Sequence, residues 1–113
     1  MAAGVQFNIK ETNKKKIVCL EGKMDALSTS HLEKKLLPLL ENGQKILLDF
    51  SKVDYLNSAG MRLLLSLTKK LKVKGGAIVF FGMNGEVSEI IKVAGFEKVL
   101  PIYPSEGAAL QAV

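Results

Sequence analysis

A serine lies among small residues where an apolar, strand-like segment gives way to an apolar, helix-like one. The stretch YLNSAGMRLLL spans Tyr55 to Leu65, and its small residues are Asn57, Ser58, Ala59 and Gly60. The oxygen of Asn57 or of Ser58 can cap the helix by accepting a backbone N–H of its first turn. The Ser58 hydroxyl can also accept a phosphoryl group, because Ala59 and Gly60 add almost no bulk beside it. Capping and phosphorylation are compatible.

The remaining polar residues do not form the convergent constellation that catalysis requires. His31 is the only histidine, and its neighbours indicate a solvated position on a helix. No loop ends in Gly-Lys-Ser/Thr, and FGMNGE lacks the third glycine of a dinucleotide fingerprint. Asp25, Asp49 and Asp54 are scattered along the chain, and no histidine or cysteine joins them. We therefore expect a protein that is not an enzyme and that binds neither metal nor cofactor.

Length and composition indicate one globular domain over residues 1–113. The chain has 113 residues, of which 48% are hydrophobic and 24% charged, an ordinary globular balance. No stretch approaches the roughly 18 to 20 apolar residues of a membrane helix, and the first ten residues lack the pattern of a secretory signal. We expect a soluble cytoplasmic protein that is a monomer and does not bind membranes.

Charge and cysteine content narrow the function further. The net charge is +5, but the lysines are dispersed apart from a run at Lys14 to Lys16, which indicates a solvated turn. Aromatic residues do not interleave with a basic stripe, so we do not expect nucleic-acid binding. The single cysteine, Cys19, lies in the apolar run KIVCL, which excludes an intramolecular disulfide and indicates a buried structural thiol.

Hydrophobic periodicity predicts an alternation of strands and helices. Two short alternating segments, 5–9 and 16–21, flank the lysine turn as a hairpin, with Gly22 ending the second strand. Continuous apolar runs predict buried strands at 45–50 and 77–81, and 99–103 reads as a last short strand. Apolar residues at helical spacing predict four helices. Their apolar positions span 27 to 40, 61 to 71 and 87 to 94, and a weak fourth helix begins at Ser105. Pro38 should kink or tighten the end of the first helix.

These elements imply an α/β fold. A hairpin followed by alternating helices and strands predicts a mixed, mostly parallel sheet of four to five strands with about four helices. The parallel strands should be joined by right-handed crossovers. No internal repeat or linker is evident.

Three stretches resemble one family. They are EGKMDA at 21–26, ILLDFSKVDYLNSAGMRLLL at 46–65 and GGAIVFFGMNGEVSEIIKVAGFEKVLPIY at 75–103. Together they look like the STAS domain of bacterial anti-sigma factor antagonists, and they cover nearly the whole chain. The middle stretch is the most specific part of the match.

The resemblance implies a regulatory function with a phosphorylation switch. Proteins of this family bind an anti-sigma factor that is also a serine kinase, and they thereby release a sigma factor. The kinase phosphorylates a serine in an Asp-Ser-Ser/Ala-Gly motif, which inactivates the antagonist, and a serine phosphatase restores it. By position the acceptor is Ser58, followed by Ala59 and Gly60. The turn Gly-x-Leu/Met-Asp matches Gly22, Met24 and Asp25, which places Asp25 near the same surface.

The implied partner-binding residues are Asp25, Asn57, Ser58, Ala59, Gly60 and Met61. Asn57 stands where the family most often has aspartate, so a kinase group that pairs with that carboxylate meets an uncharged partner. Asp25 can also be the cap of the first helix, and Met61 can also be partly core. Arg62 can meet an acidic partner.

Two other functions remain open from the sequence. STAS-like domains also serve as regulatory or structural subunits of lipid and anion transporters, and the uncharged Asn57 slightly favours this alternative. A weaker alternative is a sensor of a nucleotide or another small ligand, although the sequence contains no phosphate loop.

Overall fold

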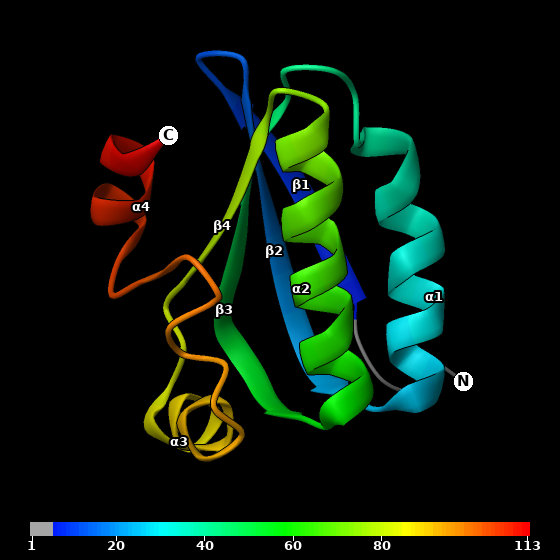
Figure 1. Cartoon of the computed structure of the whole chain (residues 1–113), viewed down its shortest axis with the longest axis vertical. Coiled ribbons are helices and arrows are strands. Elements are labelled where there is room, and N and C mark those ends of the chain that lie inside the picture. The colour runs from blue at the N-terminus through cyan, green and yellow to red at the C-terminus, as the bar shows by residue number, and fades with distance from the viewer. Residues whose placement is uncertain (1–5) are drawn as a thin grey trace.

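The computed structural model describes residues 6–113, which form a five-stranded sheet with helices on both faces (Figure 1). The elements in chain order are β1 (Gln6–Thr12), β2 (Lys15–Met24), α1 (Ala26–Leu36), a 3-10 turn (Leu37–Leu39), β3 (Lys45–Leu56), α2 (Ser58–Val73), β4 (Ala77–Phe81), α3 (Gly85–Val93), β5 (Ile102–Tyr103) and α4 (Glu106–Ala112). The predicted α/β class with an N-terminal hairpin is therefore confirmed. Val5, which the sequence placed in the first strand, lies outside the described residues.

The hairpin and the crossovers give the sheet its mixed order, β1-β2-β3-β4-β5. β1 and β2 are antiparallel, with Thr12 opposite Lys15, so the loop between them has two residues. Asn13 and Lys14 both have positive φ, 49° and 64°, as a type I′ turn requires. The other strand pairs are parallel.

Two apolar clusters hold helices to the two faces of the sheet. The larger cluster joins the sheet to α1, α2 and α3, with Leu32, Leu64 and Val87 among its members. The smaller cluster lies under α4 and includes Leu47 and Ala109. Figure 1 shows α1 and α2 side by side in front of the sheet. Their N-terminal ends therefore meet at the same edge of the sheet, the carboxyl end of the parallel strands.

Several strand boundaries differ from the prediction. β1 continues past Ile9 to Thr12, paired with β2 along this length. β2 does not end at Gly22, because that residue, with φ 118°, sits at an irregularity in the pairing with β3 and the strand continues to Met24. β3 continues past Phe50 to Leu56. Its pairing with β4 ends at Asp49, whereas its pairing with β2 continues to Leu56. β5 begins only at Ile102, because the two residues before Pro101 bond back to Phe96 and proline has no N–H to donate.

The end and the start of α1 illustrate the effect of single residues. Pro38 cannot continue an α-helix, and the chain tightens into the 3-10 turn around it, as predicted. The predicted apolar stripe begins at Leu27, but this residue stands five residues before Leu32 and is 63% exposed. A five-residue step does not keep a side chain on one helix face.

Candidate functional site

The ends of β2 and β3 bring two helix starts together. Met24 and Leu56 are partners in the parallel register, and the backbone N–H of Asn57 donates to the carbonyl of Met24 at 3.0 Å. Asp25 and Asn57 follow these residues and are the N-caps of α1 and α2. We call Asp25 together with residues 57–61 the capping junction.

Asn57, and not Ser58, caps α2. The side-chain Oδ1 of Asn57 accepts the backbone N–H of Gly60 at 3.1 Å. Ser58 is the first helical residue, and it is exposed. Because the cap is supplied by its neighbour, the Ser58 hydroxyl is not required for the start of the helix. The N–H groups of Ser58 and Ala59 have no acceptor within the helix, since the first four N–H groups of a helix lack one.

Gly60 allows the first turn of α2 to approach the sheet closely. A Cβ atom at Gly60 would stand 3.2 Å from the Cβ of Leu56 and 3.3 Å from that of Met24. Met61 follows, and its side chain is only 7% exposed, within the large apolar cluster. Ser58 is therefore exposed at the start of a helix whose first turn packs tightly on Met24 and Leu56, and Met61 belongs to the core.

Asp25 is held by a reciprocal pair of hydrogen bonds. Its Oδ1 accepts the backbone N–H of Ser28 at 2.9 Å, and the hydroxyl of Ser28 accepts the backbone N–H of Asp25 at 2.9 Å. The N–H of Ser28, and then its hydroxyl, lower the pKa of Asp25 below the ordinary value for aspartate. Asp25 is therefore ionised at neutral pH. Although Asp25 caps α1, it remains exposed at the junction.

Two large exposed side chains flank the junction and were not predicted from the sequence. Leu27, in the first turn of α1, is 63% exposed, and Tyr55, two residues before Asn57, is 43% exposed. Tyrosine is enriched at energetically important positions of protein interfaces. The burial of Val53 and Leu56, three residues apart, departs from strict strand alternation, which would have placed Tyr55 on the same face as Val53.

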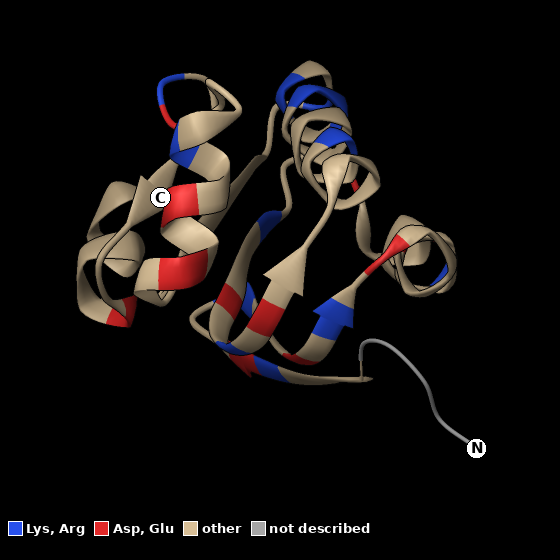
Figure 2. Ribbon diagram, turned by 90° about the horizontal axis from the view of Figure 1, so that it is seen from below, with Lys and Arg blue, Asp and Glu red and all other residues tan. Residues whose placement is uncertain are grey.

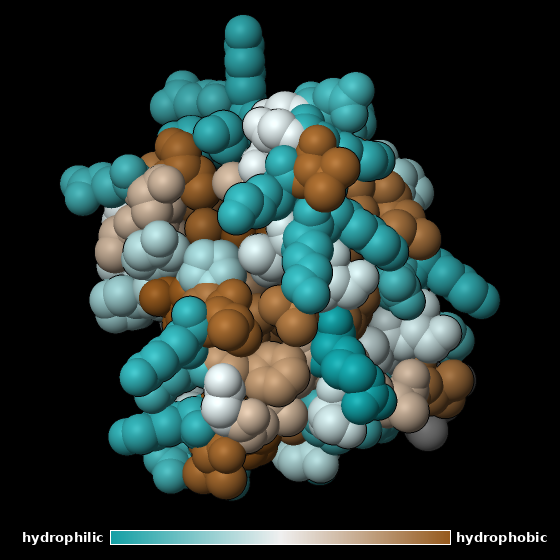
Figure 3. Space-filling view, viewed as in Figure 1, coloured by the Kyte–Doolittle hydropathy of each residue, from teal (hydrophilic) through white to brown (hydrophobic). Residues whose placement is uncertain are grey.

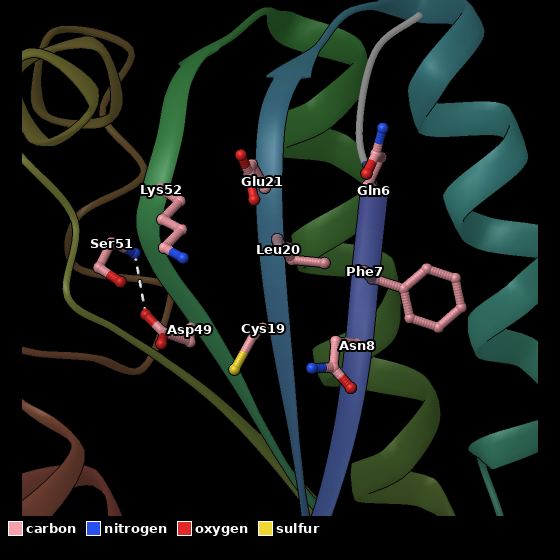
Figure 4. A pocket seen from close by; sticks show the side chains of 9 residues that line it. All are labelled: Gln6, Phe7, Asn8, Cys19, Leu20, Glu21, Asp49, Ser51 and Lys52. Atoms are coloured by element: carbon pink, nitrogen blue, oxygen red, sulfur yellow. Dashed lines mark hydrogen bonds between the residues drawn. The ribbon is translucent and has the colours of Figure 1, made fainter. Parts of the chain in front are cut away.

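Residues on the opposite face of the sheet form a separate polar hollow. Figure 4 shows Asn8, Cys19, Glu21 and Asp49 on this face, away from α1 and α2. Cys19 is half-buried, whereas the sequence predicted a buried thiol. Burial, and then the nearby Asp49, raises the pKa of the Cys19 thiol, which disfavours the reactive thiolate. This hollow contains none of the predicted site residues.

The other sequence expectations can be placed on the described part of the chain. His31 is exposed on α1, as its neighbours indicated. Within residues 6–113, no three His, Cys, Asp or Glu side chains are grouped so that they could hold a metal ion. None of the helices in this range is long and apolar enough to cross a membrane.

Comparison with known proteins identifies the family. The model of the STAS domain family matches residues 6–109. BtrV of Bordetella bronchiseptica, which is assigned as an anti-sigma factor antagonist, is 31% identical over 97 residues, covering 85% of this chain and 84% of BtrV. The anti-sigma-B factor antagonist of Bacillus subtilis is 22% identical over 107 residues, covering 95% of this chain and 98% of its own.

Solved structures show the same fold. An anti-sigma factor antagonist from Mycobacterium paratuberculosis superposes with a TM-score of 0.84 at 22% identity, over 97% of this chain and 94% of that one. The antagonist SpoIIAA in its unphosphorylated form gives 0.77 at 16% identity, over 95% of each chain. The murine anion transporter Slc26a9 gives 0.78 at 20% identity over 91% of this chain, but only 18% of the transporter is covered.

The curated relatives and the sheet topology agree on one assignment. The match extends over nearly all described residues and includes both halves of the capping junction. Anti-sigma factor antagonists are regulators and not enzymes. The chain belongs to the STAS domain family, among the anti-sigma factor antagonists.

Proposed function

We propose that this protein binds an anti-sigma factor serine kinase through the capping junction and thereby releases a sigma factor. Phosphorylation of Ser58 by that kinase switches the antagonist off, and a serine phosphatase restores it. The protein acts as a cytoplasmic monomer. The observation that carries this proposal is an exposed Ser58 at the first position of α2, beside the cap of α1. SpoIIAA, a structural relative, is known in unphosphorylated and phosphorylated forms.

The physical argument concerns where the phosphate charge would act. A phosphate on Ser58 meets the free N–H groups and the positive dipole end of α2, so the domain tolerates it. The same group adds roughly −1.5 to −2 charges to a surface that already carries the ionised Asp25. Binding of a partner fitted to the neutral hydroxyl is therefore weakened, with little change in the fold.

Labelling with radioactive ATP tests the acceptor. The parent chain and Ser58→Ala are incubated with the cognate anti-sigma kinase, and we expect incorporation into the parent only. Ser88→Ala is the matched control, because Ser88 is an exposed serine on α3. Equal labelling of Ser58→Ala and the parent would show that Ser58 is not the acceptor.

Pull-down of the same kinase tests the switch. Ser58→Asp places a negative charge at the acceptor, and we expect it to retain about a tenth or less of the parent's binding. Ser88→Asp carries the same charge on another helix and should bind as the parent does. Loss of binding by both variants would indicate an effect of net charge and would count against a local switch.

A regulatory subunit of a lipid or anion transporter is the second candidate. The observation that favours it is the uncharged Asn57 where the antagonists most often have aspartate. A unit of the same fold also occurs within the murine anion transporter Slc26a9. A transporter subunit would co-purify with a membrane ATPase and would be unaffected by kinase and ATP, so the labelling experiment separates the two functions.

A further inference from the structure

Three adjoining hollows follow α2 from its first turn to its last. The first lies between α1 and α2, the second is lined by α2 alone, and the third lies between the end of α2 and the 3-10 turn that follows α1. The first reaches Ala59, beside Ser58, and it shares Arg62 and Ser66 with the second. The second shares Lys70 with the third, which ends at Val73. We call this track from Ala59 to Val73 the α1–α2 groove. With a rise of 1.5 Å per helical residue, it is about 21 Å long.

The groove is basic along its α2 wall. Arg62, Lys69, Lys70 and Lys74 line it, and Glu33 is the one acidic residue among its lining residues. Lys70 and Glu33 approach to 3.7 Å, but both side chains are well exposed, so this pair is weak and screened. Figure 2 shows several Lys and Arg positions on α2, whereas α3 carries acidic positions.

The end of the groove farthest from Ser58 is apolar. Val73 is 87% exposed and Leu37 is 44% exposed, and Leu40 is buried beneath them. Figure 3 shows brown, hydrophobic side chains at the upper end of α2 among teal, hydrophilic ones. The Nζ of Lys74 donates to the carbonyl of Leu40 at 2.6 Å, which keeps a positive charge at this end. An aliphatic side chain flanked by carboxylates complements such a surface.

We propose that the α1–α2 groove binds an acidic segment of the partner protein that meets Ser58. The segment carries carboxylates toward Arg62, Lys69 and Lys70 and an aliphatic side chain toward Val73. This inference rests on the proposed function, since the groove begins beside Ser58 and extends the same surface. A planar anionic bilayer would touch only the rim of a groove, whereas a protein segment can follow its whole length.

Charge reversal on α2 tests the groove. Lys69→Glu with Lys70→Glu should weaken binding of the anti-sigma kinase by about tenfold or more, and it should reduce the salt dependence of the affinity. The matched control is Lys10→Glu with Lys14→Glu, which makes the same change in net charge at exposed positions of β1 and its turn. The control should bind within about twofold of the parent. Affinities are measured by isothermal titration calorimetry at three salt concentrations.

The outcomes separate this inference from the proposed function. Kinase binding that is normal in the Lys69/Lys70 variant but weak in Ser58→Asp overturns the groove and leaves the switch intact. Equal losses in the variant and its control also overturn the groove. Failure of the parent itself to bind the kinase overturns the proposed function and this inference with it. Binding to vesicles containing phosphatidylglycerol completes the test. If the Lys69/Lys70 variant loses vesicle binding while its affinity for the kinase is unchanged, the groove binds membranes and the inference of a protein segment is overturned.

Discussion

Helices α2 and α3 begin with the same local chemistry. Each follows a strand and is capped by an asparagine whose Oδ1 accepts the backbone N–H three residues later. The distances are 3.1 Å from Gly60 to Asn57 and 2.8 Å from Val87 to Asn84. Both first turns contain a glycine. By these criteria the two helix starts are equivalent.

They differ in what surrounds the cap. Gly60 is pressed against β2 and β3, whereas a Cβ at Gly85 would meet nothing within 4 Å. The first turn of α3 contains Glu86, which complements the helix dipole, whereas the first turn of α2 contains no acid. The start of α2 is therefore rigid but without a negative charge. A phosphate on Ser58 would supply that charge, so the surroundings and not the cap distinguish a candidate switch from an ordinary helix start.

The largest expected effect comes from filling the space at Gly60. Gly60→Val should lower the free energy of unfolding by about 3 kcal/mol, because the added methyl groups must displace Met24 or Leu56. Gly85→Val makes the same change in helix propensity in open space and should alter stability by less than about 0.5 kcal/mol. Urea denaturation of both variants measures the difference. Similar losses in the two would show that the close approach at α2 has no energetic consequence.

Removal of the caps should cost less stability than Gly60→Val, and here α3 should lose more stability than α2. Asn84→Ala should cost about 2 kcal/mol, because the Nδ2 of Asn84 also donates to the carbonyl of the buried Val53 at 3.1 Å. Asn57→Ala loses only the cap and should cost about 1 kcal/mol. Thermal unfolding followed by circular dichroism measures both. A larger loss for Asn57→Ala would mean that its cap does more than close the first turn.

The difference between the two helix starts could be predicted only in part. Strand and helix order followed from periodicity and from turn residues, and the tightened chain at Pro38 followed from its missing N–H. The sequence could not decide whether Asn57 or Ser58 is the cap, because both side chains can accept the bond and the backbone position selects one. The close approach of Gly60 to Met24 depends on the register between β2 and β3, which local patterns do not encode.

The α1–α2 groove could not be predicted from the sequence, because it too depends on how distant segments pack. Arg62, Lys69 and Lys70 are evident in the sequence, but whether a cation faces solvent alone or lines a track with Leu37 depends on how α1 packs on α2. In a sequence, lysines near the C-terminal end of a helix are already explained by a favourable interaction with the helix dipole. Their joint contact with one groove is a property of the packed helices.

Restoring a carboxylate at Asn57 should have a modest effect on stability and a specific one on phosphorylation. Asn57→Asp should stabilise α2 by about 0.5 kcal/mol at neutral pH, since a negative charge at a helix N-terminus is favourable. It should also raise the initial rate of Ser58 labelling if the kinase pairs with that carboxylate. Asn84→Asp is the control, because it gains the same charge but loses the donor to Val53, so it should not be stabilised. A labelling rate unchanged in Asn57→Asp would show that the kinase does not read this position.

The smallest effect concerns Asp25, the one titratable cap of the junction. Its pKa is lowered in the folded protein by the N–H and hydroxyl of Ser28, so its contribution to stability is complete above the ordinary aspartate value. That contribution is lost as pH falls from about 4 through the lowered pKa, because the unfolded chain then binds the proton more readily. Asp25→Asn keeps a cap but cannot titrate. Its free energy of unfolding should therefore change less than the parent's between about pH 4 and pH 2 in urea titrations, and the two should run in parallel from about pH 5 to pH 7. Parallel curves below about pH 4 would show that the carboxylate of Asp25 is not held by Ser28 in solution.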